Sequence, residues 1–484
     1  MKVRIEEIVK ERLVLPSFPN KIEELPEKEF KNSRISRSNV LGLISEMKKL
    51  LDQEPSVVEA FVLAEIAGLP TLLVGPHGSG KTTLAKTLAS SLTRRGKPLK
   101  FMHVTVKEVH TEYSVFARPD FGALARGEEK WIPKLVDAEF AFIDEIFRNH
   151  RIFAALNEIL EEGRFEGLPL KWIFFAAATN PPNQYYRTVD ILNYADLDRF
   201  AVIIEVEDRG LDFVDKMAEN HKLELDKKLD ISSIAKVRDS IRSVKVSPEA
   251  SIFAKLLVGA FSICRYEPVR ANSGGLIIYN KFSVINDLKC YRCVYQQHRL
   301  CSRFALAPKR AVRSLIALAK ARAWVLKRCV KVEDIWWSAK FTIPGRTAVV
   351  DKNLAEETPT YAALNSEMMK RFREWLEDVK ESFSSGGEND PLVPVLKKYL
   401  TARDVEGYRV VVEVLDEHCL KRLAKWLVLK GTSTRRAAEI VEKLSQGISV
   451  IEQGYRIVRN WTGLSVEPFK NRREAEELCN FLKG

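Results

Sequence analysis

The sequence predicts an α/β fold in which a parallel sheet, covered by helices, is followed by a helical lid and a mainly helical C-terminal module. Short apolar runs recur between helix-length segments from Thr71 to Val206. Strands that are apolar on both faces are typical of parallel sheets with helices on both sides. A glycine-rich turn, GPHGSGKT, joins the first run to a helical segment, and beyond Asp208 helical periodicity replaces the apolar runs.

Length and composition describe a large globular protein. The chain has 484 residues, enough for about three structural units, since domains usually contain roughly 100–200 residues. The net charge of +12 favours anionic partners such as phosphates, acidic protein surfaces or nucleic acid. The sequence lacks an apolar run of about 18 residues, and its first segment carries acidic side chains. We therefore expect no membrane span, no signal peptide and a cytoplasmic location.

The first two regions are an irregular arm over residues 1–37 and an α/β core over residues 38–208. Prolines and scattered charges interrupt any regular period in the arm. Apolar residues at helical spacing predict two helices between Val40 and Gly68. The core is expected to contain strands at Thr71–Val74, Leu99–Val106, Phe140–Ile143, Trp172–Ala178 and Ala201–Val206, with a helix over Thr83–Leu92.

Two further regions complete the chain. Residues 209–346 have a mainly helical pattern, without strands after Asp208, and form a predicted lid that contains a cysteine-bearing insert. Residues 347–484 form a predicted C-terminal module, mainly helical, which includes a helix over Ala362–Val379. The glycine- and serine-rich run SSGGENDP, near residues 384–391, is the predicted linker within this module.

The glycine-rich turn has the pattern G-x-x-x-x-G-K-[ST], between an apolar strand and a helix. Its glycines let backbone N–H groups point at phosphate oxygens, and the helix N-terminus adds positive potential. The lysine is expected to reach the β- and γ-phosphates. The alternative interpretation is a glycine-rich turn that binds no ligand. The nucleotide-binding residues predicted here are Gly75, Pro76, His77, Gly78, Ser79, Gly80, Lys81 and Thr82.

A pair of acids, Asp144 and Glu145, ends the apolar strand FAFIDE. In a parallel sheet these acids lie at the same edge as the phosphate loop. Asp144, together with Thr82, is expected to hold Mg²⁺, and Glu145 to orient and polarise the attacking water. An acidic pair at this place can also simply cap a helix, but its combination with the phosphate loop favours a Walker B element.

Two later polar residues also stand next to predicted strands. Asn180 ends WIFFAAATN, where its amide could bind the γ-phosphate or the attacking water, although such residues often only begin a turn. Arg199 lies in ADLDRF, directly before another apolar strand, and its alternative is a surface ion pair.

The segments GPHGSGKT, FAFIDEIFRNHRIFAALNEILEEGRF, AATNPPNQ and DLDRF, in this order, resemble the MoxR group of AAA+ ATPases from about Val40 to Arg346. The resemblance implies a P-loop AAA+ core, with Asn180 as sensor 1 and Arg199 as an arginine finger acting on ATP in a neighbouring subunit. It thereby implies a homo-oligomeric ring, expected to be a hexamer. Arg310 best fits the sensor 2 arginine that touches the γ-phosphate in cis, and Arg313 is a competing choice.

The resemblance also concerns two details near the Walker B strand. The group typically carries an insert before this strand, and residues Arg118–Phe140 occupy that place, with a loop tip expected to contact substrate at the ring pore. The group often has Asn-Arg after the acids, whereas Phe147 precedes Arg148 here. This difference weakens the assignment of Arg148 as an intersubunit residue.

Four of the seven cysteines lie in or beside the lid insert: Cys264, Cys290, Cys293 and Cys301. The Cys-x-x-Cys spacing of the middle pair suits a tetrahedral Zn²⁺ site. Reduced thiols in a packed helix are the alternative for Cys264, which lies in an apolar stretch. We expect no structural disulfide.

Three functions fit these observations. The first is a Mg-ATP-dependent ring ATPase that remodels a protein client in a chaperone-like manner, for which the resemblance implies a von Willebrand factor A-domain partner. The second is a nucleic-acid motor, because WLVLKGTSTRRAAEIVEKLSQG could form a helix-turn-helix with Arg435 and Arg436 facing DNA. The third is an ATP-gated scaffold without hydrolysis, against which the intact acids count.

Overall fold

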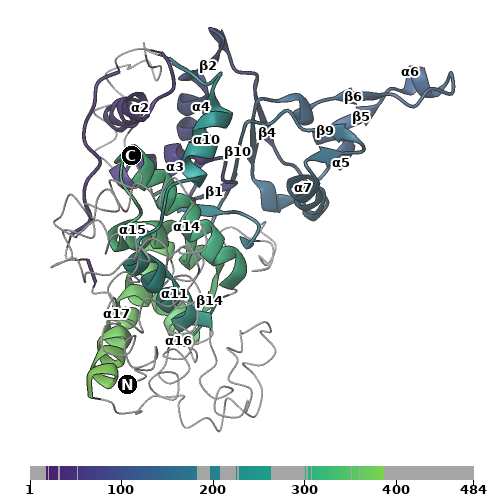
Figure 1. Cartoon of the computed structure of the whole chain (residues 1–484). Coiled ribbons are helices and arrows are strands. Elements are labelled where there is room, and N and C mark those ends of the chain that lie inside the picture. The colour runs from purple at the N-terminus through teal and green to yellow at the C-terminus, as the bar shows by residue number, and fades with distance from the viewer. Residues whose placement is uncertain are drawn as a thin grey trace, which may run out of the picture. The chain divides into compact units, whose positions relative to one another are not determined.

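A computed structural model describes residues 18–19, 21–30, 33–51, 53–181, 197–207, 225, 228–262, 300, 303–306, 308–349, 352–358 and 360–385 (Figure 1). These residues belong to one compact unit, Pro16–Glu267 with Leu276–Asp378, except for the last turns of the final helix. The first two residues of the predicted linker, Ser384 and Ser385, end the helix α17 (Tyr361–Ser385), and the rest of the linker and of the C-terminal module lies outside the described residues.

The centre of this unit is a five-stranded sheet with the order β11-β1-β10-β7-β4, in which all neighbouring pairs are parallel. This confirms the predicted α/β fold with a parallel sheet. Strands β1 (Thr71–Val74) and β7 (Phe140–Asp144) carry the glycine-rich loop and the acids at their carboxyl ends. The remaining strands are β4 (Phe101–Thr105), β10 (Phe174–Thr179) and β11 (Val202–Glu205). Parallel pairing brings all five carboxyl ends to one edge of the sheet.

Both faces of the sheet are buried, because successive side chains of a strand point to opposite faces. Phe140 and Phe142 of β7 belong to one hydrophobic cluster, whereas Ala141 and Ile143 belong to the other. The first cluster is completed by α2 (Arg37–Leu50), α3 (Pro55–Ala67), α4 (Lys81–Ser90), α14 (Pro308–Val325) and α15 (Val332–Thr342). The second is completed mainly by α7 (His150–Glu162). Removing this apolar surface from water is the main contribution to stability.

Local sequence signals set the ends of these helices. Ser36 caps α2 by accepting a hydrogen bond from the backbone N–H of Asn39, and Asn149 caps α7 in the same way through Arg151. Gly68 and Gly163 end α3 and α7 in the left-handed conformation that glycine adopts without a Cβ clash.

The described part of the N-terminal arm has no helix or strand over residues 21–30. Leu25 and Phe30 are nevertheless buried in the first hydrophobic cluster, and α2 begins at Arg37. The arm therefore contributes to the core despite its irregular backbone.

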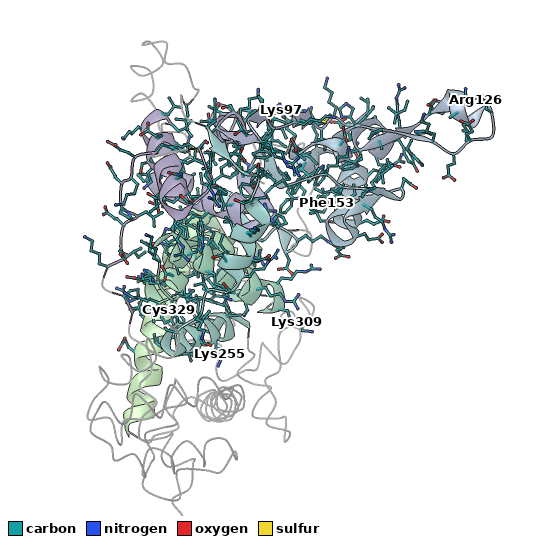
Figure 2. All side chains as sticks on the ribbon, turned by 45° about the horizontal axis from the view of Figure 1, so that its top comes forward. Lys97, Arg126, Phe153, Lys255, Lys309 and Cys329 are labelled. Atoms are coloured by element: carbon teal, nitrogen blue, oxygen red, sulfur yellow. The ribbon has the colours of Figure 1, made fainter. Side chains whose placement is uncertain are left out.

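A long hairpin projects away from the sheet between β4 and β7 (Figure 1). It consists of β5 (Ala117–Pro119), the short helix α6 (Phe121–Leu124) and β6 (Trp131–Pro133), and the strands pair in antiparallel fashion. Figure 2 shows Arg126 at its far end. Beside its base lie α5 (Glu112–Val115) and a second hairpin, β8 (Arg164–Phe165) with β9 (Leu168–Pro169). The predicted insert over residues 118–140 therefore protrudes as far as Pro133, whereas Leu135 and Val136 return to the core and Phe140 begins β7.

The lid is mainly helical, but the expectation that strands end at Asp208 is wrong. Strand β12 (Leu229–Asp230) pairs with β2 (Leu92–Arg94), which also pairs with β3 (Lys97–Pro98), and β13 (Phe304–Leu306) pairs with β14 (Thr347–Val349). Segments of two or three residues are too short to show an apolar period.

The remaining helices of the lid and of the C-terminal region are α10 (Ile234–Arg242), α11 (Pro248–Ser262), η6 (Pro344–Arg346), α16 (Lys352–Glu357) and α17 (Tyr361–Ser385). None of the helices within the described ranges is both long and apolar enough to cross a bilayer.

Candidate active site

The glycine-rich loop follows β1 and turns directly into α4. Its first residue, Gly75, donates a backbone hydrogen bond to Thr179 O at 3.2 Å, which fastens the loop to β10. A Cβ at Gly75 would overlap the carbonyl oxygen of Val206 and would press on the Ser79 hydroxyl, so no larger residue fits there. Gly80 has φ +87° and is the N-cap of α4. The loop is thus closely wrapped, with the N-terminus of α4 directed into its hollow.

Lys81 lies folded into this loop. Its ammonium donates hydrogen bonds to Gly75 O and Pro76 O, both at 2.7 Å, and the residue is buried. Burial lowers the pKa of Lys81, although the nearby carboxylates of Asp144 and Glu145 act in the opposite direction. The positive charge is therefore held where a phosphate chain along the loop would lie.

Thr82 and Asp144 meet across the gap between α4 and β7. The Thr82 hydroxyl donates to Asp144 Oδ2 at 2.9 Å, and the backbone N–H of Glu145 donates to Asp144 Oδ1 at 2.9 Å. Burial would raise the pKa of Asp144, but contacts with His103 and Thr82, together with the Lys81 charge, keep this pKa below its ordinary value. A hydroxyl and an ionised carboxylate are the oxygen ligands that Mg²⁺ prefers.

Two neighbours of this group were not predicted. His103 on β4 places Nε2 3.8 Å from Asp144 Oδ2, and Gln53 donates its side-chain amide to Ser79 O at 2.8 Å. Both belong to segments that come next to the site only through sheet pairing and helix packing. No local pattern in the sequence distinguishes them from other polar residues.

Glu145 has a left-handed backbone, with φ 54° and ψ 41°. Arg148 donates Nη1 to Glu145 Oε2 at 2.6 Å, and this contact raises the pKa of the Arg148 guanidinium. Phe147, where the MoxR resemblance favours asparagine, is buried beside Phe153 and Phe200, with ring centroids 4.9 Å and 6.3 Å away. Phe147 therefore packs in the hydrophobic core and offers no polar contact beside Arg148.

Asn180 lies at the end of β10 and is buried, with Nδ2 3.2 Å from His77 Nε2 of the loop. A cavity of about 240 Å³ opens between these motifs. The described residues that line it are His77, Gly78, Gly80, Lys81, Thr82, Thr83, Asp144, Glu145 and Asn180. The structure thus brings the phosphate loop, both acids and the strand-end amide to one pocket, while their individual roles stay predictions.

Arg199 and Arg310 lie elsewhere, since neither is among the described residues that line the pocket. Both contact Glu161 Oε1 of α7, Arg199 through Nη1 at 2.5 Å and Arg310 through Nη2 at 3.3 Å. Arg310 also approaches Asp198 Oδ2 at 3.5 Å, while the alternative residue, Arg313, is exposed on α14. The two predicted arginines therefore form one cluster outside the pocket.

Arg346 is bonded to the segment that carries Arg199. Its buried guanidinium pairs with Asp198 at 3.2 Å and donates to Phe200 O and to Ala201 O at 3.1 Å, just before β11. Burial lowers the pKa of Arg346 to about 10, against the opposing effect of Asp198. These bonds hold the segment that carries Arg199 against the end of the lid.

The pocket residues fit a nucleoside triphosphate with Mg²⁺. The Ser79 hydroxyl is buried inside the loop and has no hydrogen-bond partner among the described residues. Among the described residues Lys81 donates to carbonyls of the loop itself, and the Thr82–Asp144 pair supplies two oxygen atoms that can ligate a cation. Such a set binds phosphate oxygens and a hard cation.

The zinc prediction cannot be placed, because Cys264, Cys290, Cys293 and Cys301 lie outside the described residues. Within the described ranges, no group of three or more His, Cys, Asp or Glu side chains could hold a metal ion. Cys329, in the lid, is an exposed free thiol.

Comparisons with known proteins agree with this geometry. Residues 70–216 match the family model of the AAA domain, dynein-related subfamily. The fold is similar to the crystal structure of a "putative ATPase" from Cytophaga hutchinsonii, with 19% sequence identity and a TM-score of 0.52. That similarity covers 69% of this chain and 94% of the other chain. No curated protein matches the sequence. The chain carries an AAA-type ATPase domain, as predicted.

Proposed function

We propose that the chain is a MoxR-type AAA+ ATPase that acts as a homo-oligomeric ring, a hexamer, and uses Mg-ATP hydrolysis to remodel or assemble a protein complex. The observation that carries this proposal is the division of the predicted residues between two places. Lys81, Thr82 and Asp144 lie in the pocket, whereas Arg199 and Arg310 lie outside it. A subunit of this kind needs arginines from a neighbour to complete its site.

Each pocket residue has a distinct task in this proposal. Lys81 leaves its two loop carbonyls to neutralise the β- and γ-phosphates, and Thr82 and Asp144 hold the cation. Mg²⁺, when bound, neutralises charge on the phosphate oxygens. Glu145 accepts a hydrogen bond from the attacking water and so polarises it. Asn180 orients that water or binds a γ-phosphate oxygen.

Arg199 and Arg310 act on a neighbouring subunit in this proposal. Their shared contact with Glu161 favours a joint role over the cis contact implied for Arg310 by the MoxR resemblance. Arginine supplied in trans stabilises the charge that develops on the transferred phosphoryl group. Glu161 holds both guanidinium groups while no phosphate is near them.

The client is proposed to be a protein. The protruding hairpin supports this, since Phe121 and Leu124 of α6 are exposed to 67% and 53%. Large apolar side chains gathered on a protruding element commonly mark protein contacts. A von Willebrand factor A-domain partner rests on the resemblance to the MoxR group alone.

A nucleic-acid motor is the second candidate, favoured by the net charge of +12. Its proposed contact segment, residues 426–447, lies outside the described residues. DNA-stimulated turnover that falls steeply with salt concentration would favour this function over protein remodelling.

The test is a trap. Glu145→Gln should bind ATP without hydrolysing it and hold the client, so proteins that co-purify with this variant in ATP, and are released in its absence, identify the client. The matched control is Glu145→Gln combined with Lys81→Ala, which should not retain the client. Recovery of the same proteins with both variants would contradict the proposal.

A further inference from the structure

Arg148 stands between the predicted water-polarising residue and an exposed loop. On one side its Nη1 donates to Glu145 Oε2 at 2.6 Å. On the other side its Nε is 3.8 Å from Glu108 Oε1, too far for a hydrogen bond, and has no hydrogen-bond partner among the described residues. One guanidinium therefore lies beside two carboxylates, but of these two it is hydrogen-bonded to Glu145 alone.

The loop that carries Glu108 is fastened by the next residue, Asn149. The Asn149 amide lies within hydrogen-bond distance of three loop carbonyls, those of Lys107 at 3.2 Å, Glu108 at 3.1 Å and His110 at 2.9 Å. Its Oδ1 accepts from Arg151 N at 3.0 Å and so caps α7. One side chain thus ties the loop to the start of the helix that follows the acids.

This loop is accessible to a partner. Val109, at its tip, is 84% exposed, and the Glu108 side chain is 71% exposed. The loop follows β4 directly, where Val106 N donates to Asp144 O at 2.8 Å. A contact at the loop surface therefore acts close to both acids.

Glu145 needs support in its present conformation. A non-glycine residue is strained in the left-handed region, because its Cβ crowds the backbone. The bond from Arg148 engages Oε2, which fixes the side chain and leaves Oε1 to accept from a water. If Glu108 moved toward Arg148 Nε, the guanidinium would be drawn away and Glu145 would lose this support.

We propose that Arg148 is a positioning residue for Glu145, and that Asn149 keeps Glu108 from competing for it, so that the Lys107–His110 loop controls the rate of ATP hydrolysis. This rests on the proposed function, in which Glu145 polarises the water. Displacement of the loop lowers turnover, and fixing the loop restores it.

The experiment measures kcat and KM for ATP hydrolysis in the full chain. Arg148→Ala should lower kcat roughly tenfold or more with KM changed less than about twofold, because the side chain orients Glu145 and does not touch ATP. Arg148→Lys should recover part of the rate, since it keeps the charge but not the planar fork. Arg151→Ala, on the exposed side of the same helix, is the matched control and should leave kcat unchanged.

The loop is tested by a suppressor pair. Asn149→Ser keeps a capping oxygen but loses the amide donors, so it should free the loop and lower kcat about threefold or more. Adding Glu108→Gln to this variant removes the competing charge and should restore kcat to near the wild-type value. Thermal melting of each variant checks that the fold is retained.

Three outcomes separate the possibilities. Unchanged kcat in Arg148→Ala, with Glu145→Gln inactive, would refute the positioning role. An Asn149→Ser rate that Glu108→Gln does not restore would refute control by the loop. Absence of hydrolysis in the wild type, or hydrolysis retained by Glu145→Gln, would contradict the proposed function itself and not this coupling alone.

Discussion

Replacement of the buried Glu65 should change how stability depends on pH. Glu65 lies in α3, and its Oε2 accepts a hydrogen bond from the backbone N–H of Phe175 in β10 at 3.1 Å. Burial raises the pKa of this carboxyl from 4.5 to about 8, against the opposing effects of Thr71, Arg238 and Phe175 N. The residue thus joins α3 to the strand that directly precedes Asn180.

The sign of the effect follows from proton binding. Between pH 4.5 and about 8 the folded protein keeps a proton on Glu65 that the unfolded chain has lost. The free energy of unfolding should therefore fall as pH rises, by up to about 1.4 kcal/mol per pH unit. Over the whole interval the loss is limited to about 5 kcal/mol. Stability from this group is fully present below pH 4.5.

Glu65→Gln should remove this dependence. Glutamine keeps an oxygen for Phe175 N and cannot ionise, so its melting temperature at pH 8 should exceed that of the wild type. Between pH 6 and 8 the wild type should lose about 5–10 °C more than the variant, at roughly 2–4 °C per kcal/mol for a unit of this size. Melting curves by circular dichroism at pH 5, 6, 7 and 8 measure this.

Glu46→Gln is the matched control, because Glu46 lies on α2 with its side chain 41% exposed and should not alter the profile. Parallel melting profiles of wild type and Glu65→Gln would show that Glu65 is ionised in the folded protein, and the reasoning from burial would be wrong.

The nucleotide site and its arginine cluster make three further predictions, and the lid insert makes one. Lys81→Ala should lose most ATP affinity, since the backbone N–H groups of the loop alone cannot neutralise the phosphates, and calorimetry showing unchanged binding would contradict the assignment. Glu145→Gln should bind ATP but hydrolyse it at least roughly a hundredfold more slowly. Arg199→Ala should bind ATP yet hydrolyse it about 10³-fold more slowly, and mixing it with Glu145→Gln should restore ATPase activity if Arg199 acts in trans. An ATPase rate that does not change with the mixing ratio, in rings shown to contain both variants, would contradict this. If Cys290 and Cys293 bind Zn²⁺, elemental analysis of protein purified without added metal should find zinc, and less than about a tenth of an equivalent per chain would refute this site.

The core of the fold and the pocket could be predicted because their signals are local. The phosphate loop needs glycines, a lysine and a threonine close together in sequence, and the apolar run before Asp144 is of strand length and is bounded by acidic residues on both sides, which favours a buried strand. His103 and Gln53 could not be predicted, since their proximity to the site depends on strand pairing and on the packing of α3's preceding turn. The two-residue strand β12 was missed because its pairing with β2 leaves no periodic pattern.

The position of Arg310 shows a different limit of the sequence. The pattern around it predicts a helix, and α14 is present, but a helix pattern does not state which surface its first turn will face. That surface is set by the burial of apolar side chains such as Leu315 and Leu318 in the core. On the surface that results, Glu161 pairs with both Arg310 and Arg199, and Asp198 pairs with Arg310. Partly exposed ion pairs of this kind are weak, since Arg310 and Glu161 have side chains 45% and 57% exposed. Weak pairs can be exchanged for a phosphate at small cost, so in the proposed ring this cluster would hold both arginines ready for a neighbouring subunit's nucleotide.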